Sequence, residues 1–202
     1  MKKYEPEKLV AISRYRNYFP SLPNEIQYAV YTRMDELIAE EKEYCDKGNY
    51  SHMAQILTSI ALYETLQKQG RSEEEAYRIV SEEMWKFLDP NGIQKLARKR
   101  LFLQLMKKIV PYGFKKGSGY GWNYTWHADD PKDRFQFECN ECIYQKILGR
   151  RGLLKLGAMC CHADIINYGS LPFTDFIRSR IKKSCSAKAA CAVSQAVTRA
   201  NS

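Results

Sequence analysis

The stretch "GWNYTWHADDPKDRFQFECNECIY", residues 121–144, decides the fold class because the chain changes there from helical to strand-like sequence. Aromatic residues alternate with polar ones over residues 122–126 and again over 134–138, and a turn-forming Asp-Asp-Pro-Lys run at 129–132 separates the two segments. Alternation with a period of two residues is typical of strands, and such a run between them favours a turn. The stretch therefore predicts two strands of a small sheet.

The residues before this stretch have the spacing of helices. Apolar residues three or four positions apart predict helices over 24–45, 51–69 and 72–89, and Ser72 with Glu75 has the spacing of a capping box. A fourth helix is predicted over 91–110 and is expected to end at Pro111. Since it is apolar nearly all round from Leu101 to Val110, we expect it to be well buried.

The residues after the stretch return to helix and then to strand. Residues 145–169 predict a helix, a turn and a helix, and residues 173–181 and 189–197 predict strands. The predicted fold is α+β, with an N-terminal helical bundle packed against a small C-terminal antiparallel sheet that has short helices inserted. We predict one domain over residues 1–202, in which 1–111 is the helical part and 112–202 carries the sheet and the Cys, Asp and Arg motifs.

Charge and hydropathy restrict the partners. The net charge is +9, but on a helical wheel Lys95, Arg98 and Lys99 share one face, whereas Arg100 and Lys107 point elsewhere. The cations therefore do not form the stripe of a nucleic-acid interface, and we expect solvated helix faces and a small anionic substrate instead. No stretch approaches 18 apolar residues and no secretion signal is recognisable, so the sequence predicts a cytoplasmic protein with no membrane partner. A homo-oligomer is compatible with the sequence.

The seven cysteines are expected to be thiols, because a reducing compartment does not maintain a disulfide framework. The segment "CCHADIINYG", residues 160–169, places thiols, an imidazole and a carboxylate close together. Cys161 and Asp164 are three positions apart and share a face of a helical turn, whereas His162 lies about 100° away. Near the start of a helix the backbone amides would make such a thiol more reactive.

A zinc site is the alternative for these thiols. The pattern "CNEC" at 139–142 is followed 17 residues later by "CCH". However, the Cys-x-x-Cys segment has no glycine for a tight turn, and the adjacent Cys160 and Cys161 diverge from one another. We therefore expect no cofactor, with zinc as the alternative.

Glu64 breaks the pattern of the first half, because it falls within the apolar face of the helix predicted over 51–69. A carboxylate buried there would have a raised pKa and would suit a general acid or base. The other interpretation is that Glu64 reaches a lysine or water at the edge of the helix.

The order of residues in the C-terminal half resembles the L-2-amino-thiazoline-4-carboxylic acid hydrolase family. That family shows a strand ending in Cys-x-Tyr, then Gly-x-x-x-Leu, then Cys-x-x-Asp. This chain supplies Cys142 and Tyr144, then Gly152, then Cys161 and Asp164. The resemblance covers roughly residues 50–195.

The family pattern continues with a Pro-led strand that ends in Arg, followed eleven residues later by a Cys-Asp-Phe triplet. Here Pro172 leads the strand, Arg180 ends it and Cys191 is the cysteine. Cys191 is followed by Ala192, so the aspartate of the triplet is missing. Isoleucine also replaces the usual proline between Cys142 and Tyr144.

The resemblance implies hydrolysis of a cyclic amidine, L-2-amino-thiazoline-4-carboxylate, to N-carbamoyl-L-cysteine, or the opening of a related heterocycle. It implies a role in cysteine metabolism. It also implies a set of site residues, in which Arg180 would hold the substrate carboxylate and Asp164 would act as acid or base. Cys161 or Cys142 would attack the ring carbon or donate a proton to the departing sulfur.

The alternative, motivated by Ala192, is a non-catalytic protein of the same fold that binds a small ligand or a metal. The full set is catalytic Cys142, Cys161, Asp164 and Cys191, and substrate-binding Arg180, Tyr144 and His162.

Overall fold

The computed structural model describes residues 4–99, 101–127, 129, 131–172, 174–180 and 193–199 of the chain. The chain divides into two compact units, Met1–Phe87 and Leu88–Ser202. The division of residues 1–202 into a helical part and a sheet-containing part of one domain stays a prediction. Among the described helices, none is both long enough and apolar enough to cross a membrane.

The first unit is built around one buried helix. Fourteen of the nineteen residues of α3 are buried, and α1, α2 and α4 all pack against it. A helix that is apolar nearly all round is stable only when other elements cover it, which explains why α3 lies at the centre. The elements are α1 (Pro6–Ile12), α2 (Asn24–Glu40), α3 (Tyr50–Lys68) and α4 (Glu73–Trp85), with 3₁₀ turns η1 (Phe19–Ser21) and η2 (Lys42–Tyr44).

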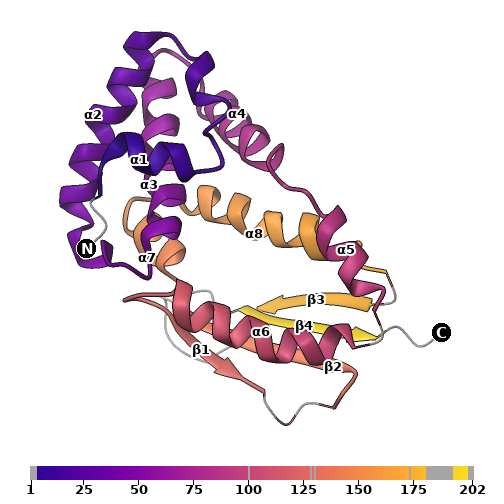
Figure 1. Cartoon of the computed structure of the whole chain (residues 1–202). Helices are drawn as coiled ribbons and strands as arrows, with labels where there is room; N and C mark the ends of the chain where they lie inside the picture. The colour runs from indigo at the N-terminus through magenta and orange to yellow at the C-terminus, as the bar shows by residue number, and fades with distance from the viewer. Residues whose placement is uncertain are drawn as a thin grey trace. The chain divides into compact units, whose positions relative to one another are not determined.

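The second unit combines helices with a four-stranded sheet (Figure 1). The strand order is β1-β2-β4-β3, and every neighbouring pair is antiparallel. This arrangement confirms the predicted α+β class, including the helical pair that precedes the last two strands. The elements are α5 (Asn91–Ala97), α6 (Phe102–Gly117), β1 (Asn123–Trp126), β2 (Arg134–Glu141), α7 (Ile143–Arg150), α8 (Leu154–Tyr168), β3 (Thr174–Arg180) and β4 (Val193–Arg199).

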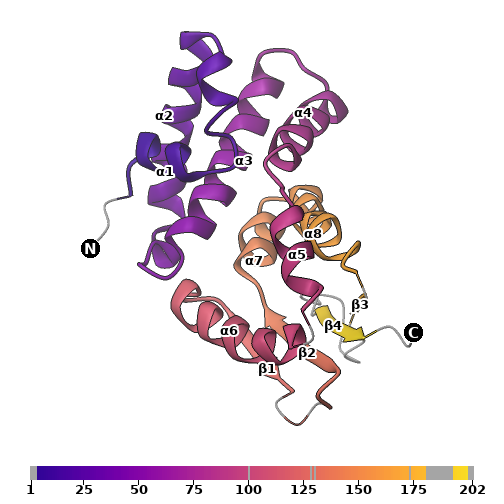
Figure 2. The ribbon, with the colours of Figure 1, turned by 45° about the vertical axis from the view of Figure 1, so that its right-hand side comes forward.

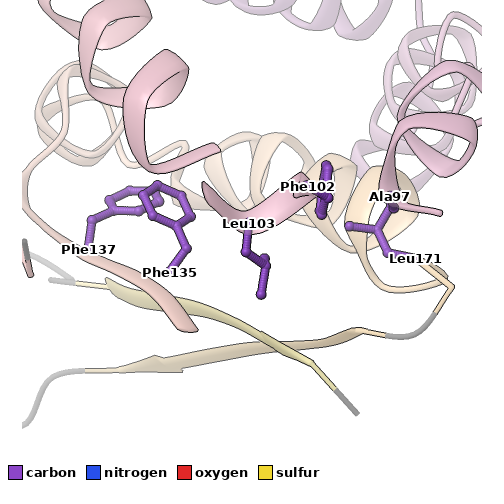
Figure 3. Close-up of a cluster of buried hydrophobic side chains, with 6 residues drawn as sticks. All are labelled: Ala97, Phe102, Leu103, Phe135, Phe137 and Leu171. Carbon is purple, nitrogen blue, oxygen red and sulfur yellow. The ribbon is translucent and has the colours of Figure 1, made fainter. Parts of the chain in front are cut away.

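The core of the second unit lies on one face of this sheet. Phe135 and Phe137 of β2 pack with Phe102 and Leu103 of α6, and Leu103 points from the helix toward the sheet (Figure 3). Tyr168, at the end of α8, packs against the same cluster. The helices α6 and α8 therefore cover the same face of the sheet (Figure 2). α6 lies over β1 and β2, and α8 lies over β3 and β4.

The single helix predicted over 91–110 is wrong in three respects. The structure has two helices, α5 and α6, and α6 continues through Pro111 to Gly117. Leu101 and Ile109 are 60% and 52% exposed, so this segment is not buried all round. Proline inside a helix costs a backbone hydrogen bond, but the turn beyond Pro111 places the Phe114 ring among the aromatic side chains of the sheet. Tertiary packing thus outweighs the local helix-breaking signal.

Gly152 has a structural role in the turn between α7 and α8. Its φ is +71°, in the left-handed region that favours glycine. The N–H of Gly152 bonds to the carbonyl of Gly149 at 3.2 Å, and the N–H of Leu153 bonds to that of Leu148 at 2.8 Å. This pair of bonds is a Schellman motif, which ends α7 and turns the chain into α8.

We expect Gly152→Ala to lower the free energy of unfolding by about 1 kcal/mol, because a Cβ is strained at positive φ. Urea unfolding followed by circular dichroism measures the change. Gly149→Ala is the matched control: Gly149 lies inside α7, and its added Cβ would meet only the Leu154 side chain at an ordinary 3.5 Å. We expect Gly149→Ala to be neutral or stabilising, since alanine favours a helix over glycine. Equal effects of the two substitutions would contradict this role of Gly152.

Candidate active site

The site predicted from the sequence begins where β2 ends. β2 ends at Glu141, and Cys142 is the N-cap of α7 in an extended backbone conformation. The strand therefore does not end in Cys-x-Tyr as the family pattern implied, because Tyr144 already belongs to the first turn of α7. The N-cap position matters for chemistry, since backbone amides at a helix N-terminus favour a negatively charged group such as a thiolate.

Three aromatic rings surround this end of β2. The Trp122 ring stacks on Tyr124, with ring centroids 5.6 Å apart and an angle of 16° between the planes. Trp122 also contacts Tyr144 edge-on at 6.1 Å. We call Trp122, Tyr124 and Tyr144 the aromatic wall. Trp122 and Tyr124 were not among the predicted site residues, although the alternating aromatics of residues 122–126 were visible in the sequence.

Tyr124 connects the aromatic wall with two thiols. Its Cα pairs with that of Cys139 across β1 and β2. Burial raises the pKa of Tyr124 well above its usual range, and negative charge on Cys139 or Cys142 raises it further, although a hydrogen bond with Ser118 opposes the rise. The hydroxyl groups of Tyr124 and Ser118 lie 3.4 Å apart. The phenol of Tyr124 is thus protonated at physiological pH.

The second group of predicted residues lies on α8. Cys161, Asp164 and Tyr168 are spaced by three and four positions, so they form one stripe along the helix. The Tyr168 ring contacts Phe176 of β3, with centroids 5.7 Å apart. This contact places Tyr168, the last member of the stripe, against β3. Cys161 and Asp164 are both partly buried.

Backbone register places Arg180 at the same end of the sheet as the first group. Tyr124 of β1 pairs with Cys139 of β2. Cys139 pairs with Val193 of β4, which pairs with Arg180 of β3. Neighbouring strands lie about 4.8 Å apart, so the backbone of Arg180 is about 10 Å from that of Cys139.

Cys161 and Arg180 lie at similar distances along their own elements from the contact between Tyr168 and Phe176. From Tyr168 back to Cys161 the helix rises about 10 Å, and from Phe176 to Arg180 the strand advances about 13 Å. The two elements run in opposite directions (Figure 1), and Asp164 is one turn closer than Cys161 to the ring contact.

Two predicted residues are not brought into this arrangement. His162 is exposed and lies about 100° around α8 from Cys161, outside the stripe. Cys191 lies outside the described residues. The sequence suggested that Cys161 could lie near the start of a helix, but it lies in the middle of α8. The thiol at a helix N-terminus is that of Cys142.

A metal centre is not formed by the residues that the structure describes, since no group of three or more His, Cys, Asp or Glu side chains could hold an ion there. Glu64 likewise does not act as an isolated buried carboxylate. Nε of Arg33 donates a hydrogen bond to Oε2 of Glu64 at 2.6 Å, and the same guanidinium also pairs with Glu36 and Glu40. This network is structural, and Arg33 is the partner where the sequence suggested a lysine or water.

Comparison with known protein families identifies one family. A family model described as L-2-amino-thiazoline-4-carboxylic acid hydrolase matches residues 49–171. The chain belongs to this family. Comparisons with curated proteins and with solved structures found no match. The resemblance carried by the cysteine, glycine and aspartate positions is thus confirmed as family membership.

The part of the chain that matches the L-2-amino-thiazoline-4-carboxylic acid hydrolase family contains most of the described site. It includes the aromatic wall, Cys142, and the stripe of Cys161, Asp164 and Tyr168. It ends at residue 171, before β3 with Arg180. The thiols and the carboxylate thus lie within the family match, whereas Arg180 is placed by the register of the sheet alone.

We expect Cys142 to be alkylated faster than Cys161 by iodoacetamide at pH 7, because the N-terminus of α7 favours its thiolate. Short exposures followed by peptide mass spectrometry give the order of reaction. Cys45 is the control for a slow thiol: burial, and to a lesser degree the charge of Asp46, raise its pKa to about 11. If Cys161 reacted first, the assignment of the activated thiol to Cys142 would be wrong.

Proposed function

We propose that this protein hydrolyses a small cyclic amidine, L-2-amino-thiazoline-4-carboxylate to N-carbamoyl-L-cysteine or a related heterocycle. The observation that carries the proposal is the strand register, which aligns the backbone of Arg180 with the end of β2 that leads into Cys142, the N-cap of α7. Asp164 on α8, within the family match, is the third residue of the proposed site, so that the site would hold a cation, a thiol and a carboxylate. Ring opening of a substrate that carries a carboxylate requires these three kinds of group: a nucleophile, a proton carrier and an anion-binding cation.

Arg180 is assigned to the substrate carboxylate. A guanidinium presents a planar fork of donors that matches a carboxylate, and it stays charged at all physiological pH values. The separation of about 10 Å between the backbones of Arg180 and Cys139, two strand spacings, leaves room for a small ring between the cation and the thiols. Arg180 would therefore orient the substrate with its amidine end toward the aromatic wall.

Cys142 is assigned as the nucleophile. Its thiolate sulfur attacks the ring carbon between sulfur and nitrogen, and the bond from that carbon to the ring sulfur breaks. Asp164, in its acid form, gives a proton to the departing sulfur, which becomes the thiol of the product. The intermediate is an isothiourea that joins the substrate carbon to Cys142.

Asp164 then acts as the base of the second step. Its carboxylate takes a proton from water, whose oxygen attacks the same carbon, and the bond to the sulfur of Cys142 breaks. N-carbamoyl-L-cysteine leaves, the thiolate is restored, and one proton of the amidinium passes to solvent. Cys161, on the same stripe as Asp164, lies beside the carboxylate and is assigned a positioning role.

The proposal also covers the location, cofactor and partners of the enzyme. We propose a cytoplasmic enzyme without a resident cofactor, whose partner is a small anionic substrate and not nucleic acid or a membrane. The second candidate function is binding of the same ligand without turnover, and the observation that favours it is Ala192 in place of the family aspartate. Zinc belongs to that second candidate, so metal analysis and a chelator accompany each assay.

We expect the protein to convert L-2-amino-thiazoline-4-carboxylate to N-carbamoyl-L-cysteine, detected by mass spectrometry, with and without chelator. Asp164→Asn should lower kcat by about 10² to 10⁴, the usual contribution of general acid–base catalysis. Arg180→Gln should raise KM by about 10- to 100-fold through loss of a charged hydrogen bond. Cys142→Ser should abolish both turnover and a covalent adduct, which is otherwise seen in quenched samples as a mass gain of one intact substrate molecule.

Cys45→Ser is the control for the thiol substitutions. Cys45 belongs to the first unit, outside the residues assigned to the reaction, and burial raises the pKa of its thiol to about 11. Its substitution should leave kcat and KM near those of the wild type. Unchanged turnover by Cys142→Ser and Asp164→Asn would refute the site, whereas binding without any product would favour the second candidate.

A further inference from the structure

The aromatic wall differs from the aromatic core beside it in its exposure. Phe135 and Phe137 are only 6% and 7% exposed, as expected for core residues. Trp122, Tyr124 and Tyr144 are partly exposed, although they join the same cluster of rings through Tyr124. The wall is thus the partly exposed edge of this aromatic cluster.

The position of the wall relative to the thiols follows from the strand pairing. Asn123 pairs with Glu141 at the last position of the β1–β2 ladder, and Trp122 and Cys142 are the next residues along the two strands. Tyr144 follows Cys142 by two residues and contacts the Trp122 ring. The indole and the thiol to which nucleophilic attack is assigned therefore come from adjacent positions at the same end of this strand pair.

Aromatic side chains of this kind suit the amidine end of the substrate. Aromatic faces attract cations, most strongly at Trp, and planar delocalised cations stack on them. An amidine is protonated near neutral pH, and its planar N–C–N unit resembles part of a guanidinium. Protonation also makes the carbon between the nitrogens and sulfur more electrophilic, so a group that prefers the cation presents the substrate in its reactive form.

We propose that Trp122, with Tyr144 at its edge, is the binding site for the amidinium group of the substrate and selects it over neutral rings of the same shape. This inference rests on the proposed function. Each charged end of the substrate then has its own binding group: the carboxylate lies at Arg180, and the amidinium lies at the aromatic wall. Trp122 determines specificity by charge, and Cys142 attacks the carbon held between the two.

The test compares two ligands that differ only at the amidine. L-2-amino-thiazoline-4-carboxylate carries the cation, and L-2-oxothiazolidine-4-carboxylate carries a neutral carbonyl on a ring of the same shape. Isothermal titration calorimetry of the full chain gives both affinities, in a Cys142→Ser background so that the ring is not opened. We expect Trp122→Leu to weaken binding of the amidinium by about tenfold or more and to change binding of the neutral ligand less than twofold.

Two further variants separate the cation effect from loss of shape. Trp122→Phe keeps an aromatic face and should retain part of the preference for the cation. Tyr120→Leu removes an aromatic side chain that is 61% exposed and has no role in the proposal, so it should leave both affinities unchanged. Circular dichroism of each variant establishes that it is folded.

The outcomes distinguish this inference from the proposed function. Equal losses for the two ligands, no loss for either, or no binding of the amidinium to the parent protein would each overturn it. A preference for the cation that depends on Trp122, found together with an absence of hydrolysis, would support the binding site and reject the hydrolase mechanism. Hydrolysis with equal affinity for the two ligands would do the reverse.

Discussion

The contact between Tyr168 and Phe176 is the constraint on which the candidate site depends. A helix that covers a sheet can rotate about its own axis, and each rotation offers different side chains to the strands. The ring contact at the end of α8 fixes one rotation, with Tyr168 against β3 and with Asp164 and Cys161 farther back on the same stripe. Antiparallel pairing of the four strands aligns Arg180 with Cys139 and Tyr124, although Arg180 lies 41 and 56 residues beyond them in the chain.

The fold class was predictable from the sequence because two periodicities differ clearly on either side of residue 121. Helical spacing before it and alternation after it each reflect which side chains a buried face requires, and these are local properties. The single helix predicted over 91–110 failed for the opposite reason. Pro111 is a strong local signal, but Phe114 finds its partners in Tyr124, Trp126 and Phe137, which are distant in sequence. No local pattern contains that contact.

The candidate site also has features that the sequence predicts and features that it does not. The pairing of Cys161 with Asp164 was predictable, because three positions on a helix always share a face. The position of Cys142 at a helix N-terminus was not, because it depends on β2 ending at Glu141 and on α7 beginning at Ile143. Gly152 is a different case: the family pattern includes it between the cysteine positions, and its positive φ and the two hydrogen bonds around it give it the role of ending a helix. Membership in a family therefore identifies positions, and only the backbone separates those that act on a substrate from those that shape a turn.

The residues assigned to ring opening and the residue assigned to anion binding come from different parts of the chain. Cys142, the N-cap of α7, and Asp164 of α8 belong to consecutive helices joined by the short turn at Gly152. Arg180 belongs to a strand beyond the family match and is aligned with β2 only through the sheet. In the proposed mechanism, a change in β3 would therefore alter which acid is bound without changing the residues assigned to ring opening. Because the aromatic wall also lies within the matched residues, the proposed recognition of the amidinium belongs to the same part of the chain as the proposed chemistry, and we expect relatives to differ first in the acid that they bind.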